Sequence, residues 1–130
     1  MRRLSLFVAL CAAGCSRGPT EVSLNQEFEL AVGQSVRVAG TGELVSFESV
    51  PSDSRCPTDV TCVWAGNALV RVRIQGLDAD STLELNTTLE PKRGSAGGVQ
   101  VELRSLDPAP LSTEPSADRH YRVRLLLRRV

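Results

Sequence analysis

Apolar and polar side chains alternate with a period of two along most of this chain. The alternation is typical of strands that turn one face to a core and the other to water. No segment holds an apolar stripe at helical spacing over three turns. The pattern therefore predicts an all-β fold of half-buried strands. The alternating segments are 27–32, 36–38, 45–48, 69–75, 83–85, 99–104 and 121–128.

Glycine- and proline-containing turn signals separate these segments. About seven short strands at this spacing predict a single antiparallel β-sandwich or barrel-like domain. Residues 91–98 are rich in glycine and predict a flexible hairpin tip, and residues 107–118 are rich in proline and predict an exposed loop. A single helical turn also fits residues 57–60.

The first fifteen residues differ from the rest of the chain. Arg2 and Arg3 precede a short apolar run, residues 4–13, and small residues then lead into Cys15. The apolar run is too short for a transmembrane helix, which needs about 20 apolar residues. A basic start, a short apolar centre and small residues at the end are typical of a cleaved export signal.

The end of this segment, Ala12-Ala13-Gly14-Cys15, resembles the signal peptides of bacterial lipoproteins. The resemblance implies cleavage of residues 1–14 as a signal peptide and lipidation of Cys15. Because Ser16 is not acidic, it also implies sorting to the outer membrane, on the periplasmic side. Residues 15–26 would form a lipidated tether, and residues 27–130 the β-sandwich domain. Several acyl chains would hold the protein on the membrane. The alternative is an ordinary secretory signal without lipid.

The charge balance gives no electrostatic basis for binding nucleic acid. The full chain has 15 basic and 15 acidic side chains, and removal of Arg2 and Arg3 with the signal leaves 13 basic side chains against 15 acidic ones. Nucleic-acid binding favours clustered positive charge, and the few aromatic side chains offer little surface for stacking bases. We therefore expect no nucleic-acid partner. No cofactor motif is present, and we expect no cofactor.

Cys56 and Cys62 form an even pair in a chain that is predicted to be exported. In an oxidising compartment, a disulfide between them is the default expectation. The alternative is a metal site, which for zinc needs about four ligands. The single histidine, His120, lies far along the chain. We therefore predict one short-range disulfide and no metal.

One motif stands apart from the alternating pattern, Asp53-Ser-Arg-Cys-Pro57, a short gap, and then Cys62-Val-Trp-Ala-Gly66. This motif resembles the core of a family of small, mostly uncharacterised bacterial exported proteins and lipoproteins. The strong match is confined to residues 53–70. The resemblance marks a family and implies no particular activity.

Two interpretations of the motif remain open, one structural and one functional. In the structural one, Asp53 forms an Asx-turn and pairs with Arg55, Trp64 lies over the disulfide and caps the core, and Gly66 takes a positive backbone angle. Arg55 could also pair with Asp59 or Glu48. In the functional one, the loop presents Arg55 and Trp64, with Asp53, to a partner, because Trp and Arg are favoured at binding hot spots.

No catalytic arrangement is evident. His120 has Asp118 and Ser116 nearby, but neighbours along a strand point to opposite faces. We therefore expect a non-enzymatic binding module, resembling an exported inhibitor in general build, for a protein or envelope component. The alternative is a structural lipoprotein that supports assembly by pairing an exposed edge strand, for which the last strand is the candidate. A hydrolase is the third hypothesis.

Overall fold

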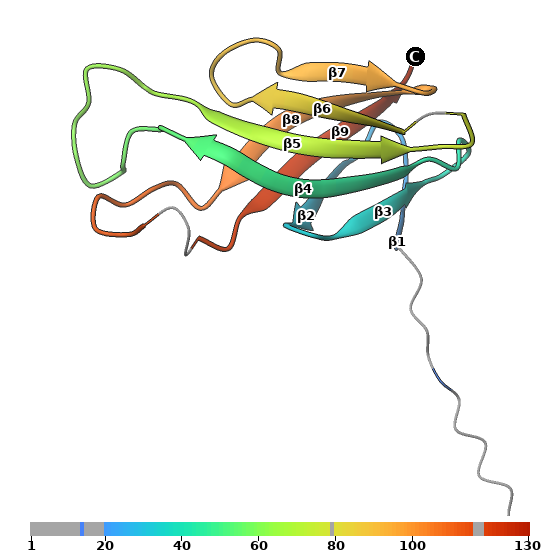
Figure 1. Ribbon diagram of the computed structural model, residues 1–130, viewed down its shortest axis with the longest axis horizontal. Helices are drawn as coiled ribbons and strands as arrows, with labels where there is room; N and C mark the ends of the chain where they lie inside the picture. Colours follow the sequence, from blue (N-terminus) through green and yellow to red (C-terminus); the bar gives the residue numbers. More distant parts are fainter. Residues whose placement is uncertain (1–13, 15–19, 79, 116–118) are drawn as a thin grey trace, which may run out of the picture.

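In the residues that the structure describes, nine β-strands form two sheets that pack face to face (Figure 1). The structure is a computed structural model that describes residues 14, 20–78, 80–115 and 119–130. Cys15 and, apart from Gly14, the predicted signal peptide lie outside these residues. Within the described part of the chain, no helix has the length and apolar character needed to cross a membrane. The prediction of an all-β sandwich is confirmed.

The larger sheet has five strands in the order β1-β3-β4-β5-β6. Its pairings are antiparallel except for that of β1 with β3, which is parallel. The strands are β1 (Thr20–Val22), β3 (Ser35–Val38), β4 (Leu44–Asp53), β5 (Ala68–Gln75) and β6 (Asp80–Asn86).

The smaller sheet has four strands, all antiparallel, in the order β2-β9-β8-β7. The strands are β2 (Glu27–Ala31), β7 (Arg93–Ala96), β8 (Val99–Asp107) and β9 (Arg122–Arg129). The last strand, β9, lies between β2 and β8, so the expectation that it offers an exposed edge is wrong. Its own apolar alternation explains this position, because a strand with three fully buried side chains gains most at the centre of the sheet.

The inward positions of the alternating segments form one continuous core. In β5, for example, Ala68, Val70, Val72 and Ile74 are buried and the residues between them are not. Burial of each large aliphatic side chain contributes about 1.5–3 kcal/mol. The period-two pattern therefore identified most of the core. The buried apolar residues outside β5 are Leu30, Val36, Val38, Val45, Phe47, Leu85, Val99, Val101, Leu103, Leu106, Tyr121, Val123, Leu125 and Leu127.

Two strands occur where the sequence predicts none. Residues 20–22, within the predicted tether, form β1 and pair with β3, so the folded domain includes residues before 27. Residues 93–96, within the predicted hairpin tip, form β7. Gly94 pairs there with Val101, and a Cβ at Gly94 would lie 3.2 Å from Leu83. Backbone pairing with a neighbour forms both strands, and local propensity does not reveal it.

Three connections lie at one end of the sandwich because β4, β6 and β8 all run toward it (Figure 1). These are the β4–β5 loop (54–67), the β6–β7 loop (87–92) and the β8–β9 loop (108–121). β1 lies toward the other end, because Val36 pairs with both Thr20 and Val45, near the start of β4. The three loops are therefore well separated from the first described strand.

Candidate functional site

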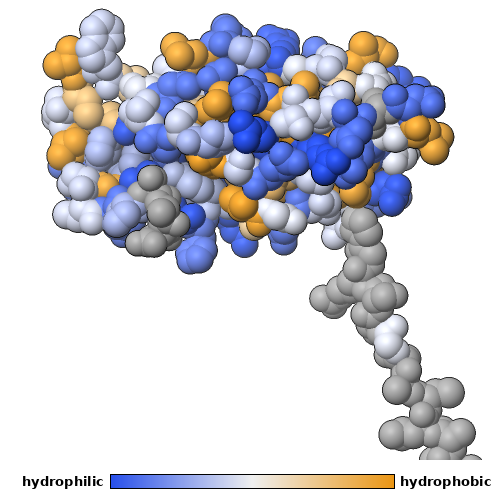
Figure 2. Space-filling view, viewed as in Figure 1, coloured by the Kyte–Doolittle hydropathy of each residue, from blue (hydrophilic) through white to orange (hydrophobic). Residues whose placement is uncertain are grey.

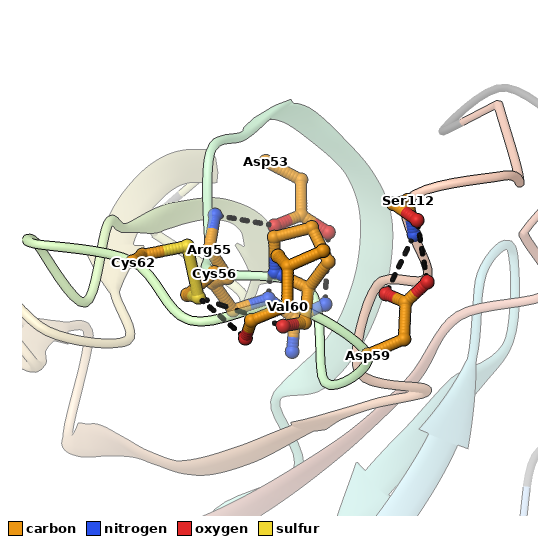
Figure 3. Close-up of a disulfide and its surroundings, with 8 residues drawn as sticks. Asp53, Arg55, Cys56, Asp59, Val60, Cys62 and Ser112 are labelled. Carbon is orange, nitrogen blue, oxygen red and sulfur yellow. Dashed lines mark hydrogen bonds and ion pairs between the residues drawn. A yellow bond between two sulfur atoms is a disulfide. The ribbon is translucent and has the colours of Figure 1, made fainter.

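The Cys56–Cys62 disulfide closes a short ring inside the β4–β5 loop, residues 54–67, which we call the stapled loop (Figure 3). The prediction of a bond between these two cysteines is confirmed. In the loop-entropy model, a ring of this size raises the free energy of the unfolded chain by about 2 kcal/mol. The bond therefore mainly fixes the conformation of the loop. Residues 57–60, where the sequence allows a helical turn, form a tight turn closed by Val60 N donating to Pro57 O at 3.3 Å.

The two arms of the stapled loop continue the pairing of β4 with β5. Ser54 N donates to Asn67 O at 2.8 Å, and Cys56 N donates to Ala65 O at 2.9 Å. Gly66 lies between these bonds with a φ of +69°, and a Cβ there would lie 1.8 Å from Ser54 O. Only glycine fits this backbone. The predicted positive angle at Gly66 is confirmed.

Asp53, the last residue of β4, anchors the base of the loop. Its side chain is 1% exposed. Oδ1 accepts hydrogen bonds from the Arg55 amide at 3.2 Å and from Arg55 Nε at 2.9 Å, and Oδ2 accepts one from Arg55 Nη2 at 2.8 Å. These contacts are the predicted Asx-turn and ion pair. Oδ2 also accepts from Tyr121 Oη at 2.8 Å and from Arg119 Nη1 at 3.0 Å.

The two arginines connect this carboxylate to the β8–β9 connection. Arg55 Nη1 donates to Leu106 O at 2.7 Å, and its Nη2 donates to Pro108 O at 2.9 Å. Arg119 Nη2 donates to Glu114 O at 3.1 Å. The Arg55 side chain is 14% exposed and that of Arg119 is 7% exposed. Each guanidinium therefore joins the charge on Asp53 to backbone carbonyls from a distant part of the chain.

Arg119 and Tyr121 were missed as partners of Asp53 by sequence reasoning. A signal for them was present. Tyr121 lies on the predicted inward face of the last strand, and a buried tyrosine hydroxyl needs a hydrogen-bond partner. Arg119, two residues earlier, lies on the same face. The sequence does not show which carboxylate the fold brings close to these two side chains.

The electrostatics of the cluster favour an ionised Asp53. Burial by itself raises the pKa of Asp53, but hydrogen bonds from Arg55 and Tyr121 outweigh burial and lower the pKa to about 2. Burial and the hydrogen bond to Asp53 raise the pKa of Tyr121. The carboxylate therefore stays charged and the phenol stays protonated over the physiological range.

A second set of contacts fixes the stapled loop against the β8–β9 loop. Thr58 N donates to Pro110 O at 3.0 Å, and Ser112 N donates to Asp59 Oδ1 at 2.9 Å. The Ser112 hydroxyl bonds to the other oxygen of Asp59 (Figure 3). These bonds from Ser112 lower the pKa of Asp59. The loop is thus held at its base by Asp53 and at its side by Asp59.

The tip of the stapled loop carries exposed apolar side chains. The side chain of Val63 is 92% exposed and that of Trp64 is 83% exposed. The structural interpretation, in which Trp64 caps the core over the disulfide, is wrong, because Trp64 is exposed while Tyr121 and Leu106 are buried beside the base of the loop. Figure 2 shows apolar residues at the end of the molecule where this loop projects.

The structure separates the predicted binding residues into two groups. Asp53 and Arg55 lie in the interior cluster, whereas Trp64 stands at the surface. His120 is exposed, and its neighbours Ser116 and Asp118 lie outside the described residues. Across residues 20–78, 80–115 and 119–130, no three His, Cys, Asp or Glu side chains are grouped in a way that could hold a metal ion. The arrangement can present an apolar contact on a firmly held loop.

Comparison with known proteins does not assign the chain to a group. The sequence matches no protein-family model, and neither a curated protein nor a solved structure shows significant similarity to it.

Replacing Asp53 with asparagine tests the buried cluster. Asp53→Asn keeps the size of the side chain but leaves Arg55 and Arg119 buried without their counter-charge. We expect the free energy of unfolding in urea to fall by about 3–5 kcal/mol. Asp80→Asn is the matched control, because it breaks an exposed ion pair with Arg73 and should change stability far less. Equal losses of unfolding free energy in the two variants would contradict a buried, stabilising role for Asp53.

Acid titration tests the lowered pKa of Asp53. The pKa is about 2 in the folded chain and about 3.9 in the unfolded chain. The stabilisation from this shift is therefore complete above about pH 4 and is lost as the pH falls toward 2. The difference in unfolding free energy between wild type and Asp53→Asn should shrink by about 2 kcal/mol between pH 5 and pH 2. A difference that does not change with pH would show that Asp53 has an ordinary pKa.

Proposed function

We propose that the protein is an outer-membrane lipoprotein whose domain acts as a non-enzymatic binding module in the periplasm. The observation that carries the proposal is the exposure of Trp64 on a loop that is held in place on two sides. A large exposed aromatic side chain on a fixed loop is typical of a binding hot spot. The export signal and Cys15 support the compartment and the anchor.

The contacts at the base of the loop support binding through pre-organisation. A flexible loop loses conformational entropy when it binds, and a loop already fixed loses less. The disulfide, the Asp53–Arg55 pair and the Asp59–Ser112 contact all restrict the stapled loop before any partner arrives. In this proposal Asp53 and Arg55 position the loop, and Trp64 with Val63 makes the contact.

The placement of β1 supports a loop that faces away from the anchor. Eight residue-to-residue steps along β4 lead from Val45, beside β3 and near β1, to Asp53 at the base of the stapled loop. That stretch of strand spans about 26 Å. Lipid at Cys15 would hold the β1 side of the domain close to the membrane and leave the loop available to a periplasmic partner.

Edge-strand pairing, the alternative function, has less support. The outer strands of the two sheets are β1, β6, β2 and β7. β1 and β7 are short, and β2 and β6 carry charged side chains, both of which discourage pairing with another chain. The exposed apolar loop is therefore the better candidate.

Affinity capture tests the proposed function. Full-length protein with an affinity tag would be isolated from its native cells as wild type, Trp64→Ala or Leu77→Ala, and the co-purified proteins quantified by mass spectrometry. Leu77 is the control, because it is also exposed but lies in the β5–β6 turn at the other end. We expect a partner that Leu77→Ala retains and Trp64→Ala reduces by about 30-fold, as for a hot-spot residue. Equal recovery with all three proteins would refute the role of the loop.

A further inference from the structure

Exposed apolar side chains gather at the end of the sandwich that carries the stapled loop. Of the eight large apolar side chains exposed among the described residues, five lie on the three loops at this end. A sixth, Val32, lies outside these loops, in the β2–β3 turn, where its amide donates to Tyr121 O. Leu77 and Val130 lie at the other end. We call the five the three-loop surface. They are Val60, Val63, Trp64, Leu89 and Leu111.

Hydrogen bonds make these three loops one unit. The amides of Thr88 and Leu89 donate to Asn67 Oδ1 at 3.0 and 3.2 Å, and this ties the β6–β7 loop to the base of the stapled loop. On its other side, the Asp59–Ser112 contacts tie the stapled loop to the β8–β9 loop. Leu89 and Leu111 therefore flank the stapled loop in fixed positions.

Among the described residues of the three loops themselves, the exposed charged side chains are acidic, and the exposed Arg93 and Arg122 lie on the strands that follow. Asp59, Glu90 and Glu114 are exposed, one on each loop. Among the described bases of these loops, Arg55 and Arg119 are bound within the Asp53 cluster, and Lys92 is half-buried next to β7. An apolar centre with an acidic border complements an apolar site with a basic border.

This charge distribution distinguishes between possible occupants. Acidic side chains are repelled by anionic lipid headgroups. In a symmetric dimer the same acidic border would face itself, which also disfavours a second copy of this chain. The shape adds a further condition, because the stapled loop projects beyond the β6–β7 loop (Figure 1). A flat partner that touched its tip would leave Leu89 uncovered, whereas a concave one could bury all three loops.

We propose that the partner is a protein with a concave apolar cleft bordered by basic side chains, and that the three loops enter it together. This inference rests on the proposed function and extends the binding site from one loop to three. Val63 and Trp64 fill the cleft, Leu89 and Leu111 contact its walls, and the three acids face its basic border. The three loops therefore form one convex binding site that fits a cleft.

Photo-crosslinking with a benzophenone amino acid tests the three-loop site. The full-length chain in its native cells would carry the probe at Val63, Leu89 or Leu111, with Leu77 as the control position. We expect the same protein adduct from the three loop positions and none from Leu77. Mass spectrometry of the crosslinked peptides should locate them around one cleft of the partner that has Arg or Lys at its border.

Charge reversal tests the acidic border in the same cells. Glu90→Lys combined with Glu114→Lys should lower the yield of the Val63 adduct about five- to tenfold, because two attractions become repulsions. Asp78→Lys, an exposed acid at the other end, should leave the yield unchanged. An unchanged yield with the double variant would overturn the proposal that the cleft of the partner has a basic border.

Other outcomes separate this inference from the proposed function. An adduct from Val63 but not from Leu89 or Leu111 would overturn the three-loop site and leave single-loop binding in place. Adducts with lipid, or with a second copy of this chain, would overturn the choice of a cleft in another protein. No protein adduct from any of the three positions, with equal capture by wild type and Trp64→Ala, would overturn the proposed function itself.

Discussion

The Asp53 carboxylate joins two distant parts of the chain at one buried point. Asp53 is the last residue of β4, and its carboxylate binds Arg55 of the stapled loop and Arg119 and Tyr121, which lie just before β9. A buried carboxylate needs this many partners, because its desolvation is otherwise too costly. The arginines also donate to backbone carbonyls at the end of β8 and in the β8–β9 loop. The base of the stapled loop is therefore held against the end of β8 and the β8–β9 loop by groups that meet at a single negative charge.

These polar contacts explain how the domain, which has few aromatic residues, can leave its single tryptophan exposed to solvent. The core below the stapled loop is complete without Trp64, and the loop gains its order from polar contacts and a disulfide. Val63 and Trp64 are therefore free of any role in packing. Apolar side chains that a fold does not use, on a loop that it holds firmly, are the usual material of a binding surface.

The sequence pattern was sufficient for the all-β fold, most of the core and the disulfide, because each depends on local periodicity or on pairing of the remaining cysteines. It also identified the Asp53–Arg55 pair, which lies within three residues. It missed Arg119 and Tyr121, since their contact with Asp53 depends on β4 and β9 meeting across the sandwich. It left open whether Trp64 caps the core or faces a partner, because hydrophobicity alone does not show that Tyr121 and Leu106 are already buried at that end. Strands β1 and β7 were missed for a similar reason, since backbone pairing creates them.

Amide hydrogen exchange in the stapled loop tests most directly whether the buried cluster holds it. Ser54 N and Cys56 N donate across the base of the loop, and Thr58 N donates to the β8–β9 connection. If the cluster fixes the loop, these three amides in the wild-type protein should exchange nearly as slowly as those of the central strand β5. Exchange at rates typical of an unstructured loop, with β5 still protected, would contradict a pre-organised loop held by Asp53.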